Sequence, residues 1–254
     1  MESIGSRHRG EFDGKSIVVT GGASGIGLEI ANRLCTEGAL VSIGDVADSL
    51  DTLEDRLGPG ATAAYCDVAD SAQVDALIQG AHRRCGRLDG VVNVAGVSGL
   101  PQLTADISDA EFDRVIAVNL KGTFYSMRSA IPLIQSSGGG SIVNISSIAA
   151  DVVFPLQGAY SASKGAINSL TRTAAREYAP AGVRINAIQP GLIDTPMYRA
   201  TATPETDQYI VSRTPAGRIG TPGDVASSVL YLLSESSTFV TGVTLRVDGG
   251  WVLG

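Results

Sequence analysis

The sequence predicts a single α/β domain with a doubly wound, mostly parallel sheet of seven strands and helices on both faces. Two observations support this prediction. Short apolar runs alternate with segments of helical periodicity along all 254 residues, and no linker, repeat or change of composition divides the chain. Such alternation is typical of parallel sheets buried on both faces. We therefore expect one domain over residues 1–254, with a polar tail at 1–14 and a loop-rich insertion at 191–215.

The expected strands are short runs rich in Val, Ile, Ala and Leu. They cover residues 16–19, 39–44, 61–66, 88–92, 141–145, 183–188 and 243–247. Helices are expected between them, because apolar residues recur there every three to four positions. They cover residues 28–34, 48–57, 71–85, 108–135, 158–178 and 224–233.

The composition excludes several classes of function. The formal net charge is −7 and no basic cluster occurs, which argues against nucleic acid or an anionic membrane as a partner. With His8 and His82 as the sole imidazoles, we expect neither a metal site nor a Ser-His-Asp triad. The three cysteines lack C-x-x-C spacing, as free thiols in a reducing compartment do. No segment has the pattern of a signal peptide or membrane helix, so we expect a cytoplasmic protein.

A glycine-rich turn follows the first strand and leads into the first helix. It reads Thr20-Gly21-Gly22-Ala23-Ser24-Gly25-Ile26-Gly27. Backbone N–H groups at a helix N-terminus favour negative charge, and glycines let the backbone approach a ligand closely. The turn therefore predicts a phosphate site, although glycines there can also be purely structural. Its spacing differs from G-x-G-x-x-G, because three residues separate the first two glycines of the pattern.

Polar and small residues follow six of the expected strands. In chain order these are Gly21, Asp45, Asp67, Asn93, Ser147 and Pro190. Doubly wound sheets bind ligands at the carboxyl ends of their strands. We therefore expect these loops to converge on one rim and to form the site there.

Asp45 ends the second strand and indicates which nucleotide is bound. A carboxylate in this position can accept hydrogen bonds from both hydroxyls of an adenosine ribose, and it repels a 2′-phosphate. Val46 follows it, with no Arg or Lys nearby to bind that phosphate. The pair predicts NAD rather than NADP. The alternative is an Asp that caps a helix or a turn.

Tyr160 and Lys164 form a second candidate pair. Residues four apart share a helix face, so the ammonium can approach the phenol and lower its pKa from about 10. Ser147, upstream at the end of a strand, can donate to a substrate oxygen and hold it near Tyr160. Asn119 interrupts the apolar pattern of the long helix, either for a polar role facing inward or as a satisfied buried amide.

Together these motifs resemble a known family. Thr20-Gly21-x-x-x-Gly25-x-Gly27, Asn93-x-Ala95-Gly96, Asn119, Ser147, Tyr160-x-x-x-Lys164 and Pro190-Gly191 are similar to those of the classical short-chain dehydrogenase/reductases, in the family's order, over residues 14–254. The resemblance implies a Rossmann fold, a homotetramer, and a catalytic tetrad of Asn119, Ser147, Tyr160 and Lys164. Val94 replaces the second Asn often found in the family's loop.

The resemblance also implies a mechanism and a set of cofactor-binding residues. Tyr160 takes the alcohol proton while a hydride passes to the nicotinamide. Ser147 polarises the substrate oxygen, Lys164 lowers the Tyr160 pKa and holds the ribose, and Asn119 supports a water relay. The NAD-binding set is Gly21, Ser24, Gly25, Ile26, Gly27, Asp45, Val46, Asp67, Val68, Asn93, Ala95, Gly96, Tyr160, Lys164, Pro190, Gly191, Ile193 and Thr195.

The function expected is therefore that of an NAD-dependent oxidoreductase that interconverts a secondary alcohol and its ketone. A 3-oxoacyl thioester reductase and a nucleotide-binding sensor without turnover are the alternatives. The substrate pocket would draw on Ser98, Gly99, Asp151, Phe154, Gln157, Leu192, Met197 and Tyr198. That mixture leaves small or cyclic alcohols, polyols and hydroxy acids open. Asp151 is expected to be a solvated charge at the rim, with a substrate contact as the alternative.

Overall fold

The computed structural model describes residues 10–253 and shows a seven-stranded sheet in the order β3-β2-β1-β4-β5-β6-β7. Every pair of neighbouring strands is parallel. The strands are β1 (Ser16–Thr20), β2 (Leu40–Asp45), β3 (Ala61–Tyr65), β4 (Gly90–Asn93), β5 (Gly140–Ile145), β6 (Val183–Pro190) and β7 (Thr244–Val247). The order reverses at β1, so a crevice opens between the loops that follow β1 and β4.

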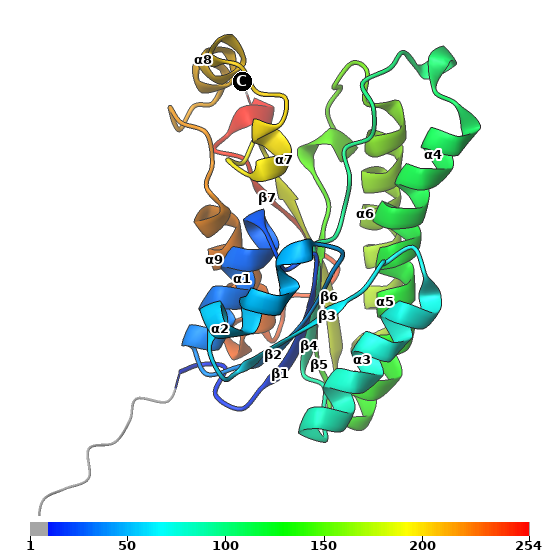
Figure 1. The fold of residues 1–254 in the computed structure, drawn as a ribbon, viewed down its shortest axis with the longest axis vertical. Coiled ribbons are helices and arrows are strands. Elements are labelled where there is room, and N and C mark those ends of the chain that lie inside the picture. The colour runs from blue at the N-terminus through cyan, green and yellow to red at the C-terminus, as the bar shows by residue number, and fades with distance from the viewer. Residues whose placement is uncertain (1–9, 254) are drawn as a thin grey trace, which may run out of the picture.

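Helices cover both faces of the sheet (Figure 1). One layer holds α1 (Gly25–Thr36), α2 (Leu53–Leu57) and α9 (Pro222–Leu233), and the other holds α3 (Ser71–Cys85), α4 (Asp109–Ile116), α5 (Gly122–Ser136) and α6 (Gly158–Tyr178). Because β1 alternates its side chains, Ile17 and Val19 pack into the core under α1 and α9, whereas Val18 packs into the core under α3 and α5. The predicted doubly wound fold is confirmed.

Two expected elements differ in the structure. The helix expected over residues 108–135 is interrupted by a π-turn at Ala117–Lys121, between α4 and α5. The insertion over residues 191–215 is not merely loop-rich, because it contains α7 (Pro196–Arg199) and α8 (Pro204–Arg213). A threonine caps each of these helices and a proline opens its first turn, a combination that starts a helix without needing a long apolar pattern.

The N-terminal segment is also more structured than its polarity suggests. Residues 1–9 of the expected tail lie outside the described residues, but residues 10–14 form hydrogen-bonded turns against the sheet. Phe12 is 3% exposed and belongs to the core under α1. Across residues 10–253, no helix has the length and apolar character needed to cross a membrane.

Candidate active site

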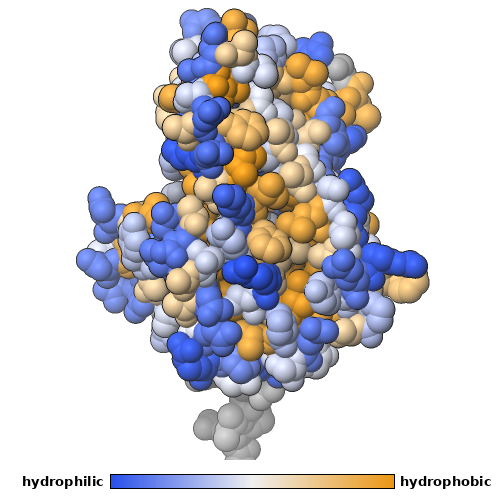
Figure 2. Space-filling model, turned by 90° about the vertical axis from the view of Figure 1, so that its right-hand side faces the viewer, coloured by the Kyte–Doolittle hydropathy of each residue, from blue (hydrophilic) through white to orange (hydrophobic). Residues whose placement is uncertain are grey.

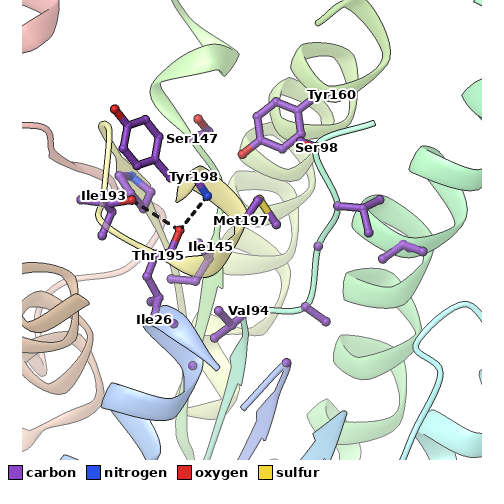
Figure 3. A pocket seen from close by; sticks show the side chains of 18 of the residues that line it. Ile26, Val94, Ser98, Ile145, Ser147, Tyr160, Ile193, Thr195, Met197 and Tyr198 are labelled. Atoms are coloured by element: carbon purple, nitrogen blue, oxygen red, sulfur yellow. Dashed lines mark hydrogen bonds between the residues drawn. The ribbon is translucent and has the colours of Figure 1, made fainter. Parts of the chain in front are cut away.

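A cavity of about 550 Å³ opens where the carboxyl ends of the strands meet the loops that follow them. The glycine turn and the start of α1 form one wall. The loops after β4 and β5, α6 and the segment from Pro190 to α7 form the others. The side chains of Ser147, Tyr160, Met197 and Tyr198 face this space from three different segments (Figure 3). Its volume is within the range of small-molecule and cofactor sites.

The cavity brings together eighteen of the twenty residues that the sequence singled out as catalytic or cofactor-binding. Asn93 and Asn119 are the two that do not line it. The residues that the sequence analysis assigned to the substrate pocket also line this cavity, apart from Asp151. Sequence reasoning did not name several further residues of the wall, which belong to loops already recognised: Gly44, Cys66, Val97, Pro101, Val118, Ile145, Ser146, Ile148, Ala149, Pro196 and Thr201.

The glycine turn is packed so closely that larger residues do not fit. A Cβ on Gly27 would lie 2.0 Å from the carbonyl oxygen of Gly21, and a Cβ on Gly21 would lie 2.7 Å from Cα of Ala95. Gly21 and Gly25 also adopt positive φ angles of 70° and 52°. The turn therefore holds the N-terminus of α1 against the loop after β4, at the edge of the cavity.

The start of α1 lies at the cavity. Ser24 is the N-cap residue, but its side chain makes no capping hydrogen bond. The first N–H groups of a helix have no partner within the helix and favour an anion. Ser24, Gly25 and Ile26 all line the cavity. The geometry fits the pyrophosphate of a dinucleotide.

Asp45 ends β2 and lines the same cavity. Its Oδ2 accepts from the amide of Ala23 at 2.9 Å, and its Oδ1 accepts from the amide of Val46 at 2.7 Å. The carboxylate therefore ties the glycine turn to the end of β2, which is the structural alternative that the sequence left open. Oδ1 also accepts from the amide of Ala47 at 3.2 Å. Each carboxylate oxygen has two lone-pair sites, so Oδ2 keeps one site to accept from a ligand.

Ser147 and Tyr160 form the polar centre of the cavity, and both side chains line it. Ser147 follows β5 with extended backbone, and its Oγ also accepts from the amide of Ala149 at 3.1 Å. Tyr160 lies in the first turn of α6. The two hydroxyls thus come from separate elements, each held by its own backbone environment, and they can contact the same substrate oxygen.

Lys164 lies one turn further along α6 and is 3% exposed. Its Nζ donates to the carbonyl of Ile145 at 2.8 Å and lies 5.6 Å from the ring centroid of Tyr160. Burial lowers the pKa of Lys164 to about 8, so the side chain remains charged at neutral pH.

The pKa of Tyr160 is set mainly by its burial. Burial raises this pKa above its usual value, and the nearby Ser147 side chain opposes only part of this effect. That Lys164 lowers the Tyr160 pKa stays a prediction. The Nζ of Lys164 is directed at the carbonyl of Ile145. At neutral pH the phenol therefore keeps its proton, the form that can donate to a ketone.

Buried Lys164 should make stability depend on pH. The folded protein releases the lysine proton near pH 8 and the unfolded chain near pH 10.5, so the unfolded chain binds more protons between these values. The free energy of unfolding should therefore rise across this window, by up to about 3 kcal/mol. Chemical denaturation between pH 7.5 and pH 10 measures it, with Lys164→Met as the reference. A wild-type curve parallel to that of the variant would contradict the prediction.

Asn119 lies in the π-turn and is fully buried. Its Oδ1 accepts from the amide of Val97 at 2.8 Å, and its Nδ2 donates to the Val97 carbonyl and to Ser163 Oγ, each at 3.0 Å. The side chain is thus a satisfied buried amide that fixes the loop after β4 to α6. Its place in a water relay stays a prediction.

Asn93 ends β4, but its side chain points into the core. Its Nδ2 donates to Oδ1 of Asn144 at 2.8 Å, and Asn144 in turn donates to Thr171 on α6 at 2.9 Å. This buried network connects β4, β5 and α6 beneath the cavity. Oδ1 of Asn93 has no hydrogen-bond partner within residues 10–253.

Asp151 is exposed, as expected for a solvated charge, but it is paired with other side chains and does not line the cavity. Its Oδ2 accepts from Arg246 at 2.8 Å and from Gln189 at 3.0 Å. These bonds hold the pKa of Asp151 below its usual value, with the bond from Arg246 the largest cause. The ion pair fastens the segment after Ser147 to β6 and β7. Among residues 10–253, no group of His, Cys, Asp and Glu could hold a metal ion.

Comparison with known proteins places these features in a family. Residues 21–252 match the family model described as enoyl-(acyl carrier protein) reductase. The 2-(S)-hydroxypropyl-CoM dehydrogenase 3 of Xanthobacter autotrophicus is 38% identical over 243 residues, which cover 92% of this chain and 95% of that protein.

Two solved structures are similar over nearly the whole chain. The crystal structure of levodione reductase has a TM-score of 0.91 and 33% identity, covering 96% of this chain and 99% of that one. The 3-ketoacyl-(acyl-carrier-protein) reductase of Brucella melitensis, complexed with NADH, has a TM-score of 0.89 and 32% identity, covering 94% and 98%. The chain therefore belongs to the classical short-chain dehydrogenase/reductases, a family of oxidoreductases that use a nicotinamide nucleotide.

Proposed function

We propose that this enzyme uses NAD(H) to interconvert a secondary alcohol and its ketone, with Tyr160 as the general acid and base. One observation carries the proposal. The hydroxyl groups of Ser147 and Tyr160 line the same cavity as the N-terminus of α1 and Asp45. One cavity therefore contains both a proton donor for the substrate oxygen and the backbone groups that can bind a dinucleotide.

Each side chain has a defined task in this proposal. When bound, the nicotinamide supplies or accepts the hydride. Tyr160 gives its phenolic proton to the ketone oxygen in reduction and takes it from the alcohol in oxidation. Ser147 Oγ holds the same oxygen in place. The ammonium of Lys164, next to the Tyr160 ring, stabilises negative charge on the phenol and can donate to a ribose hydroxyl.

The charges on the cavity wall support NAD over NADP. Asp45 and Asp67 line the part of the cavity next to the glycine turn, and Lys164 is the only cationic side chain among the described residues of the wall. A 2′-phosphate near Asp45 would meet a carboxylate and no Arg or Lys. Val46, which is 54% exposed, offers no charge there.

Cofactor preference should therefore reverse when these two residues are exchanged. We expect the double variant Asp45→Ser, Val46→Arg to shift the ratio of kcat/KM for NADH over NADPH by about 100-fold towards NADPH, because one repulsive charge is lost and one attractive charge is added. Steady-state rates with each cofactor measure the ratio. Asp45→Asn, which keeps an acceptor for the Ala23 amide, is the control. An unchanged preference in the double variant would show that Asp45 does not select the nucleotide.

A panel of alcohols and ketones, assayed with NAD(H) and NADP(H) in parallel at the nicotinamide absorbance, tests the activity itself. Turnover of secondary alcohols or ketones with NAD(H) is the expected result. The similar structure from Brucella melitensis is named a 3-ketoacyl-(acyl-carrier-protein) reductase, so a 3-oxoacyl thioester belongs in the panel as the second candidate. Nucleotide binding without turnover of any substrate would instead indicate a sensor.

We also propose that the enzyme is a homotetramer and is cytoplasmic. Apolar side chains gather on the face formed by α4 and α5 (Figure 2), where Phe112 is 42% and Phe124 is 41% exposed. Apolar surface of this kind favours contact with a second copy. Three free cysteines are consistent with a reducing compartment. Sedimentation of the wild type and of Phe124→Asp tests the assembly, and the variant should sediment as a smaller species.

A further inference from the structure

We propose that the substrate is a neutral secondary alcohol or ketone with an apolar body, and that the enzyme discriminates against carboxylates and other anionic substrates. This inference rests on the proposed function, because it concerns the substrate half of the same cavity. Among the substrate classes that the sequence leaves open, it argues against hydroxy acids.

The inference rests on the side chains that line the substrate half of the cavity, beyond Ser147 and Tyr160. The apolar side chains there include Val97, Ile148, Phe154, Leu192 and Met197, and Ser98, Tyr198 and Thr201 add hydroxyl groups. Gln157 adds a neutral amide that can donate or accept. The two carboxylates of the described wall, Asp45 and Asp67, follow β2 and β3 and so belong to the nucleotide end.

The one cation of the described wall is already engaged. Lys164 donates to the carbonyl of Ile145 at 2.8 Å and lies against the ring of Tyr160. Its charge therefore acts on the reacting oxygen and the nucleotide. It is not available to pair with an anionic group on the body of a substrate.

The charged side chains near the opening of the substrate half of the cavity also argue against an anionic substrate. Arg199, next to the wall residues Met197 and Tyr198, is bound at Nε by Asp194 and at Nη1 by Asp207, each at 2.6 Å. Arg246 is paired with Asp151 at 2.8 Å. Both guanidinium groups are therefore already paired with carboxylates, and neither is free to bind an anionic substrate.

Burial of a carboxylate without a partner is strongly unfavourable, whereas a neutral ring gains from contact with the apolar wall. A matched pair of ketones isolates this effect: methyl 4-oxocyclohexanecarboxylate and 4-oxocyclohexanecarboxylate share the ring and the reacting carbonyl and differ in charge. We expect kcat/KM for the ester to exceed that for the acid by at least ~100-fold. Equal or better use of the acid would overturn the inference.

A positive charge added to the cavity wall should reduce the discrimination against the acid. Met197 lines the cavity and is 48% exposed, so Met197→Lys adds a cation near the mouth. Met197→Gln, of similar length and neutral, is the control. The Lys variant should raise the acid-to-ester ratio of kcat/KM by at least ~10-fold over the Gln variant. The same ratio in both variants would show that charge is not what excludes the acid.

Measuring how the ester and the acid bind, without turnover, distinguishes a failure of this inference from a failure of the proposed function. Trp251 is the only tryptophan of the chain, and it stacks on Phe154 of the cavity wall with ring centroids 6.4 Å apart. Its fluorescence therefore reports on the substrate half without turnover. If no ketone is reduced with either cofactor, the proposed function fails. Titration of the NAD⁺-loaded enzyme still tests the inference: binding of the ester and much weaker binding of the acid supports it. Equal binding, or no binding of the ester, overturns it.

Discussion

Tyr160→Phe is expected to lower kcat for ketone reduction by about 10²–10⁴-fold and to leave nucleotide affinity nearly unchanged. The ring remains in place next to Lys164, and only the phenolic hydroxyl is lost. Steady-state assays measure the rate, and calorimetric titration with NAD⁺ measures the affinity.

Tyr178→Phe is the matched control for this substitution. Tyr178 is the last residue of the same helix, about 27 Å from Tyr160 along the axis, and it packs against the core under α3 and α5. It should keep nearly the wild-type rate. If Tyr160→Phe also retains most of the rate, another group transfers the proton and the mechanism proposed here is wrong.

Gly27→Ala should remove nucleotide binding and destabilise the fold by about 1–3 kcal/mol or more. Its Cβ would lie 2.0 Å from the Gly21 carbonyl oxygen, so α1 would have to move away from the turn. That movement displaces the backbone donors of Ser24, Gly25 and Ile26 from the cavity. Chemical denaturation measures the stability, and titration with NAD⁺ measures the binding.

Gly80→Ala provides the same change in another helix, α3, where the nearest atom to the new Cβ is 4.0 Å away. Alanine is about 1 kcal/mol more favourable than glycine inside a helix, so this control should be stabilised and should bind NAD⁺ normally. Equal behaviour of the two variants would mean that close packing at Gly27 does not shape the nucleotide site.

Sequence analysis correctly predicted the position of residues that depend on local geometry. The glycines of the turn, the strand ends at Asp45 and Ser147, and the i, i+4 spacing of Tyr160 and Lys164 each follow from a few consecutive residues. The rule that ligands bind at the carboxyl ends of parallel strands then brings them to one rim.

Sequence analysis did not predict the hydrogen-bond partners of residues that pair with distant parts of the chain. Asp151 pairs with Arg246, 95 positions later, and Asn93 bonds to Asn144, 51 positions later. Neither partner can be identified from the local pattern. The helices α7 and α8 were missed for a different reason: they begin at capping threonines and prolines, and their apolar periodicity is weak.

By itself, the sequence determined the fold class, the loops that meet at the rim and the family to which the chain belongs, because apolar periodicity, strand ends and motif spacing are local properties. Only the tertiary structure decided which polar side chains face the cavity. Asn93 bonds to Asn144 within the core, Asn119 bonds to Ser163 on α6, and burial raises the Tyr160 pKa. These outcomes depend on desolvation and on partners from distant strands, which exist only once the sheet has assembled.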